Sequence, residues 1–153
     1  MIFFKTEFEL TDFNYSHPTS KGYRFCSGNK LHFYPATGNG LVNGVLELYL
    51  EQETEGVDKS VVDRWVWDKL GSSGINFPLS SVDHYLYVMP GNVEFGGAAA
   101  YACLWCPKTV YWNYQASNYQ VLLHEVGHNL GHVHSGKDGG SYNDRTCWMG
   151  KIL

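Results

Sequence analysis

Hydrophobic spacing divides the chain into predicted strands and helices. Residues 3–13 and 44–51 alternate apolar with polar side chains, and the second run places leucine at Leu46, Leu48 and Leu50. A period of two is typical of a strand with one buried face. The two runs therefore predict an opening strand and a second half-buried strand, with a loop-rich stretch between them.

Segment 58–71 changes to a helical period. Its apolar side chains fall on one face of a helix, and Ser60 and Asp63 have the spacing of a capping pair. Gly71 is suited to end the helix. The segment is therefore predicted to be an amphipathic helix that packs its apolar face on the core.

Three further segments predict the remaining strands. Residues 84–90 form an apolar run stopped by a proline, as expected of a buried inner strand. The glycine-rich segment 91–105 leads into another extended stretch, and residues 109–114 predict a further short strand. Strands and helices in this mixture indicate an α+β (α/β-like) fold with one mixed sheet.

The last predicted helix spans residues 118–130. Ser117 and Gln120 have the spacing of a capping box at its start. Gly131 is suited to the left-handed conformation that closes a helix. Because the apolar side chains share one arc, the helix is expected to pack that side on the core and to turn its histidines to the other side.

The sequence HEVGHNLGHVHSG, which begins at His124, predicts a metal site. His124 and His128 lie about 6 Å apart along the helix axis, so both imidazoles can reach one ion. His132 would lie about 12 Å from His124 on a continuous helix, too far to share a tetrahedral ion. If Gly131 turns the chain back, His134 can approach that ion. The expected ligands are His124, His128 and His134, with His132 facing solvent or the neighbouring loop.

A site with three imidazole ligands has catalytic potential. Three neutral imidazoles leave a fourth zinc position for water, which distinguishes a catalytic site from a closed structural one. Zinc can lower the pKa of that water to about 7 and can polarise a substrate carbonyl. Glu125 is rotated by about 100° from the ligand before it, so its carboxylate can point at the water. We expect Glu125 to act as general base and then as proton donor to the leaving amine.

Length, composition and charge limit the other function classes. The 153 residues suit a single domain over 1–153, and 44% hydrophobic with 17% charged residues is typical of an ordered globular protein. The net charge of -4, without a Lys/Arg cluster, argues against nucleic acid and anionic membranes as partners. No apolar run reaches the roughly 18 residues of a membrane span, and no signal peptide is visible.

Cysteines leave several pairings open. The even set allows two disulfides in any of three pairings among Cys26, Cys103, Cys106 and Cys147. Cys103 and Cys106 form a CxxC pair, which can be a redox motif or half of a zinc site. The pair lacks a thioredoxin-like βαβ setting, and no second CxxC occurs. A structural disulfide or two reduced core thiols is the favoured interpretation.

The longer motif resembles a known family of peptidases. HExxHxxGxxH is similar to the pattern of the metzincin zinc peptidases, which also carry a methionine turn beneath the metal; here SYNDRTCWMG supplies Met149. Together with VDHYLYVMP and FGGAAAYA upstream, these motifs look most like the gametolysin (autolysin) family, whose members degrade extracellular matrix or cell-wall glycoproteins. The resemblance is best supported over residues 82–150.

This resemblance implies a metzincin catalytic domain, with a twisted mixed sheet, a backing helix and a zinc-binding helix below a substrate cleft. It also implies one catalytic Zn2+, a protein or glycoprotein substrate and a secreted, extracellular endopeptidase. Residues 95–104 are the candidate edge strand for pairing with extended substrate, and Met149 would support the zinc histidines without binding the ion. The substrate-cleft candidates are Gly96, Gly97, Ala98, Tyr142 and Trp148. For the two aromatic residues, core packing is an equal alternative.

Three positions depart from the family pattern. His132 replaces a more common leucine-like residue, which predicts a more polar surface below the metal or a group that titrates near neutral pH. Lys151 occupies the position of a tyrosine in some metzincins, so no tyrosine is assigned to the oxyanion. The chain ends soon after Met149, whereas metzincins usually continue into a C-terminal helix. The chain is therefore expected to be either a minimal version of the fold or a fragment truncated at the C-terminus.

Two function classes remain consistent with the sequence. The first is an active zinc endopeptidase, and the second is a catalytically inactive zinc-binding or interaction domain that keeps the fold. A domain that only bound metal would not need the carboxylate of Glu125. The intact glutamate therefore favours the enzyme.

Overall fold

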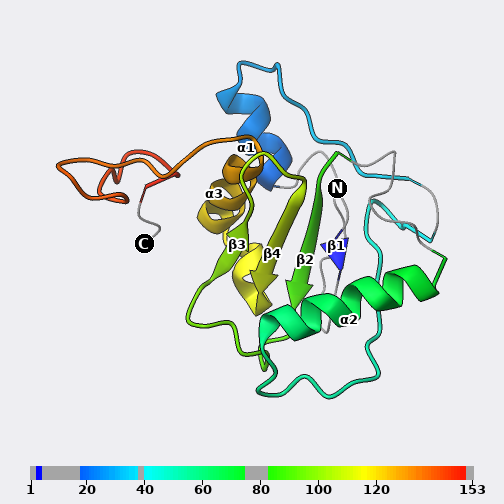
Figure 1. Ribbon diagram of the computed structural model, residues 1–153. Helices are drawn as coiled ribbons and strands as arrows, with labels where there is room; N and C mark the ends of the chain where they lie inside the picture. The colour runs from blue at the N-terminus through cyan, green and yellow to red at the C-terminus, as the bar shows by residue number, and fades with distance from the viewer. Residues whose placement is uncertain (1–2, 5–17, 38–39, 75–82, 151–153) are drawn as a thin grey trace.

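A computed structural model describes residues 3–4, 18–37, 40–74 and 83–150. Within these residues the protein combines one four-stranded sheet with helices (Figure 1). In chain order the elements are β1 (Phe3–Phe4), α1 (Pro18–Cys26), α2 (Lys59–Ser72), β2 (Tyr85–Met89), β3 (Ala100–Ala102), β4 (Lys108–Trp112), the 3-10 helix η1 (Asn113–Ser117) and α3 (Tyr119–Asn129). The predicted α+β class with a mixed sheet is confirmed.

The sheet has the strand order β1-β2-β4-β3. Strands β1, β2 and β4 are parallel, with Tyr85 opposite Lys108 at one end of the β2–β4 pair. Strand β3 lies at one edge and runs antiparallel to β4, with Ala100 opposite Tyr111. The predicted segments 84–90, 91–105 and 109–114 therefore each coincide with a strand in whole or in part.

Side chains of β2 alternate between two hydrophobic clusters on opposite faces of the sheet. Tyr85, Tyr87 and Met89 belong to the cluster beneath α2. Leu86 and Val88 belong to the cluster that contains α1 and α3 residues. All five residues are buried, as expected for an inner strand covered on both faces. Helix α2 therefore covers one face, and α1 and α3 cover the other (Figure 1).

The predicted strand at 44–51 is wrong. Val45 makes an isolated bridge with Val42, and residues 46–51 form no ladder with any described strand. Leu46 and Leu48 are nevertheless buried in the cluster beneath α2. The alternation arose because one side of an extended segment packs on this cluster, and such packing does not require backbone pairing.

Helix α1 lies in the stretch that was expected to be loop-rich. Its first residue is Pro18, a position at which proline is tolerated because the missing N–H would have no partner within the helix. Tyr23 is buried, and its hydroxyl donates to the backbone oxygen of Leu123 at 2.6 Å. This bond ties α1 to α3. Of the predicted opening strand, Phe3–Phe4 is a strand, and residues 5–13 lie outside the described residues.

Helices α2 and α3 lie close to their predicted ranges, but their predicted caps are wrong. The carboxylate of Asp58 accepts from the amide of Ser60 and caps α2, while Asp63 pairs with Lys108. Asn118, and not the residue before it (Ser117), caps α3. Asp58 and Asn118 have extended backbones and short side-chain acceptors, which suit the capping position.

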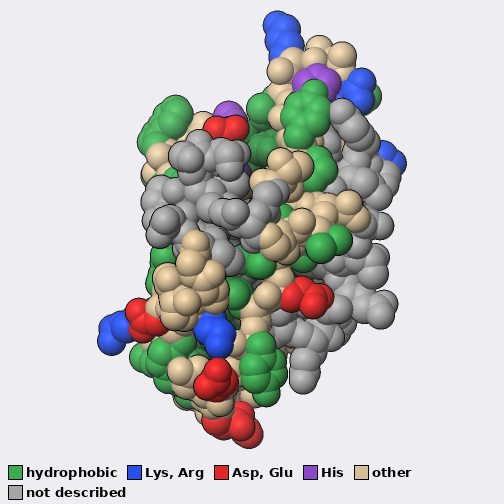
Figure 2. Space-filling model, turned by 90° about the vertical axis from the view of Figure 1, so that its right-hand side faces the viewer, with side chains coloured by type: hydrophobic (Ala, Val, Ile, Leu, Met, Phe, Trp, Pro, Cys, Tyr) green, Lys and Arg blue, Asp and Glu red, His purple; other side chains and the backbone are tan. Residues whose placement is uncertain are grey.

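Charges of both signs are interspersed on the face shown in Figure 2, where acidic and basic side chains lie among apolar ones. This agrees with the small net charge of -4. In the part of the chain that the structure describes, no helix combines the length and the apolar character needed to cross a membrane.

Candidate metal centre

Three histidines converge at the C-terminal half of α3. The ligand atoms of His124, His128 and His134 all lie within 4.8 Å of one another. The ring centroids of His124 and His128 are 4.8 Å apart, and those of His124 and His134 are 5.3 Å apart. Two of the side chains come from α3, and the third comes from the segment that follows it. The fold therefore brings together the three residues that the sequence predicted as metal ligands.

The reversal that delivers His134 depends on the turn at Gly131. Its amide donates to the backbone oxygen of His128 at 2.9 Å, and the amide of His132 donates to that of Gly127 at 2.9 Å. These are the two bonds of a Schellman motif. Gly131 has φ +87°, a conformation that glycine adopts without the steric cost of a Cβ. The predicted helix end is confirmed, and the side chain of His132 is exposed as expected.

Backbone carbonyls orient two of the imidazoles. Nδ1 of His124 lies 2.7 Å from the carbonyl oxygen of Trp148, and Nδ1 of His128 lies 2.8 Å from that of His132. Because a carbonyl oxygen only accepts, each Nδ1 carries the proton and donates it. Each Nε2 is then left with a lone pair for a metal, as is usual for metal-binding histidines. His132 thus contributes its carbonyl to the site and not its ring.

Local electrostatics favour the neutral form of the His124 and His134 imidazoles. Burial lowers the pKa of His124 below its ordinary value, with the hydrogen bond to Trp148 acting in the opposite direction. Burial likewise lowers the pKa of His134, and His128 lowers it further. Neutral imidazole is the form that binds a metal. The donor set therefore fits zinc, for which histidine nitrogen is a common ligand.

Glu125 follows His124 in α3 and is buried, with 6% of its surface exposed. Burial raises the pKa of its carboxyl to about 7, because the charged form loses solvation. A carboxyl with such a pKa can take up and release a proton near neutral pH. A dication bound by the histidines would act in the opposite direction, since a nearby positive charge favours the carboxylate.

Met149 packs directly against α3. It is buried, and its Sδ lies so close to Gly127 that a Cβ there would be 2.5 Å away. Gly127 stands between the two helical histidines in sequence. The backbone oxygen of Met149 also accepts from the amide of Ser135 at 2.8 Å. Met149 therefore contacts both α3 and the segment after His134.

A small polar network in the loop after His134 was not predicted from the sequence. The hydroxyl of Ser135 donates to the Asp144 carboxylate at 2.9 Å, and the amide of Asp144 donates to the Ser135 carbonyl at 3.3 Å. The hydroxyl and amide of Thr146 both donate to Asp144, and these bonds hold the pKa of its carboxyl below the ordinary value. An aspartate two residues before a threonine was the available signal, because it is typical of an Asx turn.

The two aromatic cleft candidates have different environments. The ring of Tyr142 lies 3.9 Å from that of His134, centroid to centroid, and the residue is 44% exposed. The ring of Trp148 lies 6.1 Å from that of Tyr23 and packs against the cluster around α1 and α3. Tyr142 therefore borders the histidines, whereas the ring of Trp148 belongs to the core.

The three small cleft candidates form an exposed turn before β3. Gly96 and Gly97 have φ values of +69° and +76°, and Ala98 follows them. The Lys59 side chain at the start of α2 is the close neighbour of Gly96. The part of this segment that packs against the α1 and α3 cluster is residues 99–100.

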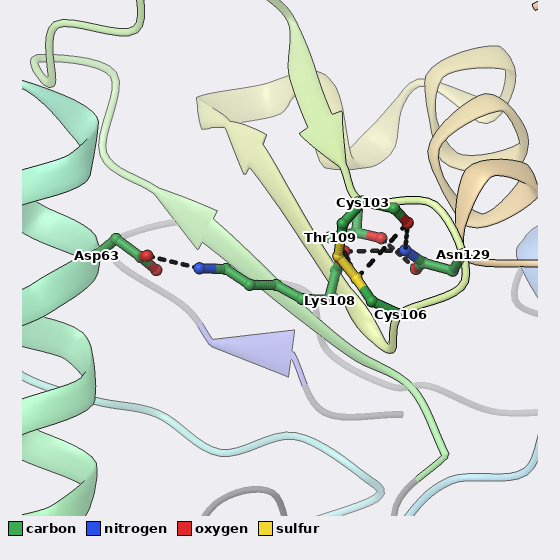
Figure 3. Close-up of a disulfide and its surroundings, with 6 residues drawn as sticks. All are labelled: Asp63, Cys103, Cys106, Lys108, Thr109 and Asn129. Atoms are coloured by element: carbon green, nitrogen blue, oxygen red, sulfur yellow. Dashed lines mark hydrogen bonds and ion pairs between the residues drawn. A yellow bond between two sulfur atoms is a disulfide. The ribbon is translucent and has the colours of Figure 1, made fainter.

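Cys103 and Cys106 form a disulfide that closes the turn between β3 and β4 (Figure 3). Cys26 and Cys147 are free thiols. The interpretation of the CxxC pair as a structural disulfide is confirmed. Because both sulfur atoms are joined to each other, they are not half of a zinc site.

Replacing Gly131 should test the turn that delivers His134. Gly131→Ala is expected to lower the free energy of unfolding by roughly 2 kcal/mol in urea titrations, because alanine is strained at positive φ and its methyl collides with the indole of Trp105. Gly139→Ala is the matched control, since Gly139 has φ +82° and open space around it. Equal losses for both variants would show that the Trp105 contact contributes nothing.

Comparison with known proteins places the chain among peptidases. A family model described as Gametolysin peptidase M11 matches residues 20–152, a span that includes all three histidines. No curated protein gives a significant match. The family match agrees with the resemblance found in the histidine and methionine motifs. Since the match covers most of the sequence, the chain belongs to the gametolysin peptidase M11 family.

Proposed function

We propose that this protein is a zinc-dependent endopeptidase that uses Glu125 as its general base. The observation that most directly supports this is the convergence of three histidine ligand atoms within 4.8 Å of one another, two of them on the helix that also carries the buried Glu125. Membership of a peptidase family supports hydrolysis of peptide bonds as the reaction. The same histidines in a chain without Glu125 would support metal binding alone.

His124, His128 and His134 would hold the ion, and bound zinc would supply a Lewis acid and an acidified water. Glu125 would take up a proton from the water that attacks the substrate carbonyl. It then delivers that proton to the leaving amine, so that the carboxyl returns to its starting state. Burial raises the pKa of the Glu125 carboxyl, whereas bound zinc would lower it and so favour the carboxylate that accepts the proton.

Strand β3 supports an extended peptide as substrate. It pairs with β4 on one side and is an edge of the described sheet, so its other side offers backbone groups to a further strand. Tyr142, packed on the ring of His134, offers an aromatic surface to a substrate side chain. Gly96, Gly97 and Ala98 form an exposed turn just before this strand.

We further propose extracellular matrix or cell-wall proteins as substrates and a secreted location. The disulfide between Cys103 and Cys106 supports the secreted location, because such bonds persist mainly in oxidising compartments.

Metal removal tests the proposed function. Treatment with 1,10-phenanthroline should abolish cleavage of casein or gelatin by the purified protein, and stoichiometric zinc should restore it. Magnesium is the control and should not restore cleavage, because it prefers oxygen ligands to imidazole nitrogen. Cleavage that persists after zinc has been removed completely, as measured by atomic absorption, would rule out the zinc mechanism.

A further inference from the structure

The tip of the β3–β4 hairpin, residues 103–106, rests on the C-terminal end of α3 (Figure 3). Its ends are joined by the disulfide, with a Cα–Cα distance of 5.6 Å between Cys103 and Cys106. The tip contains none of the three histidines. Two neighbouring residues of α3, the histidine His128 and Asn129, nevertheless form hydrogen bonds with this hairpin.

Asn129 makes the side-chain part of this connection. Its Nδ2 donates to the backbone oxygens of Cys103 at 3.1 Å and Lys108 at 2.9 Å, which lie on either side of the hairpin turn. Its Oδ1 accepts from the hydroxyl of Thr109 at 2.6 Å. Asn129 is buried, with 6% of its surface exposed. A buried carboxamide with both donors and its acceptor satisfied fixes α3 against the hairpin and β4.

Trp105 makes the backbone part of the connection. Its amide donates to the backbone oxygen of His128 at 3.2 Å, and its indole lies directly on Gly131. Trp105 has φ +58°, which is uncommon for a bulky residue and persists only where the surrounding structure enforces it. The disulfide on either side and the bond to His128 are the constraints that hold this conformation.

We propose that the disulfide-closed hairpin tip is a positioning element for the metal ligand His128. Asn129 and Trp105 hold the last turn of α3, on which both His128 and the Gly131 reversal depend. The inference rests on the proposed function in that a metal binds at the three histidines. It does not require that the bound metal hydrolyse a peptide.

Opening the hairpin and removing the carboxamide should act on the same connection. Without the disulfide, the oxygen of Cys103 and the amide of Trp105 are no longer held at fixed places against α3. Without the carboxamide of Asn129, the closed tip loses its side-chain hydrogen bonds to the helix and keeps only the contacts of Trp105 with His128 and Gly131. The two changes share one route to His128, so their effects on metal affinity should not add.

Metal affinity is the direct test. Zinc dissociation constants are measured by competition with a chromophoric chelator, and the visible spectrum of the cobalt(II) form reports ligand geometry. Asn129→Leu and the pair Cys103→Ala with Cys106→Ala should each weaken zinc binding by about 10-fold, as is typical of residues that orient metal ligands. Both should shift the cobalt bands, and the combined variant should be no more than about 10-fold weaker than wild type.

Matched variants separate positioning from general loss of stability. Cys26→Ala removes an exposed free thiol and should leave zinc affinity unchanged. Val62→Ala opens a cavity beneath α2, on the other face of the sheet, and should lower thermal stability without changing the cobalt spectrum. Thr109→Ser keeps the hydroxyl that Asn129 accepts from and should retain zinc affinity, whereas Thr109→Val should lose part of it.

The outcomes distinguish this inference from the proposed function. If the wild type binds zinc but the hairpin variants keep its affinity and its cobalt spectrum, the hairpin is structural only and the inference is overturned. If zinc binding behaves as expected and the wild type cleaves no peptide, the endopeptidase function fails and the positioning role stands. A wild type that binds no zinc overturns both.

Discussion

Glu125→Ala is expected to lower kcat/KM for peptide cleavage by about a thousandfold while zinc stays bound. The size follows from the usual contribution of a positioned general base. Zinc should stay because the three histidines supply the ligand atoms and Glu125 is not among them. Cleavage of a fluorogenic peptide and zinc content by atomic absorption are the two measurements.

Glu125→Gln provides the matched control for that substitution. Glutamine keeps the size of the buried side chain but cannot take up the proton of the attacking water. If the base role is correct, both variants lose cleavage to a similar extent. Loss of zinc in both would instead assign Glu125 a role in metal binding, and full activity of either variant would remove it from the mechanism. An inactive wild type with zinc bound would favour the non-catalytic domain.

Helix α3 and the histidines on it could be predicted well because the sequence signals for them are local. Histidines four residues apart face the same side of any helix, so the convergence of His124 and His128 follows from the helical period alone. The turn at Gly131 was equally accessible, because glycine is the residue that a left-handed helix end favours. These two local facts were sufficient to nominate His134 over His132.

Residues that hold the site could not be predicted in the same way. Asn129 bonds to Cys103, 26 residues earlier, and His124 bonds to the carbonyl of Trp148, 24 residues later. Asparagine within a helix carries no local signal of such a partner, and a backbone carbonyl carries none of its own. Only the folded chain brings these groups within hydrogen-bond distance.

The errors in the predicted secondary structure have related causes. Leu46 and Leu48 alternate with polar residues as a strand does, but periodicity reports which side is buried and not whether the backbone is paired. Helix α1 has a mixed composition that includes a proline and a glycine. Its helical state depends on contacts with α3, such as the bond from Tyr23 to Leu123.

His134→Ala is expected to weaken zinc binding by more than about 100-fold, whereas His132→Ala should leave it unchanged. The first substitution removes one of three converging ligand atoms, so the loss should exceed the 10–100-fold typical of residues that only orient ligands. The second removes an exposed ring. The competition assay with a chromophoric chelator measures both dissociation constants.

The substitutions of His132 and His134 form a discriminating comparison because only the side chain of His134 is expected to bind the metal. The carbonyl of His132 accepts from Nδ1 of His128 at 2.8 Å, and this oxygen survives truncation of the ring. His132→Ala should therefore preserve the orientation of His128 as well as the number of bound zinc ions. If zinc is lost from His132→Ala and retained by His134→Ala, the assignment of His134 as the third ligand is wrong.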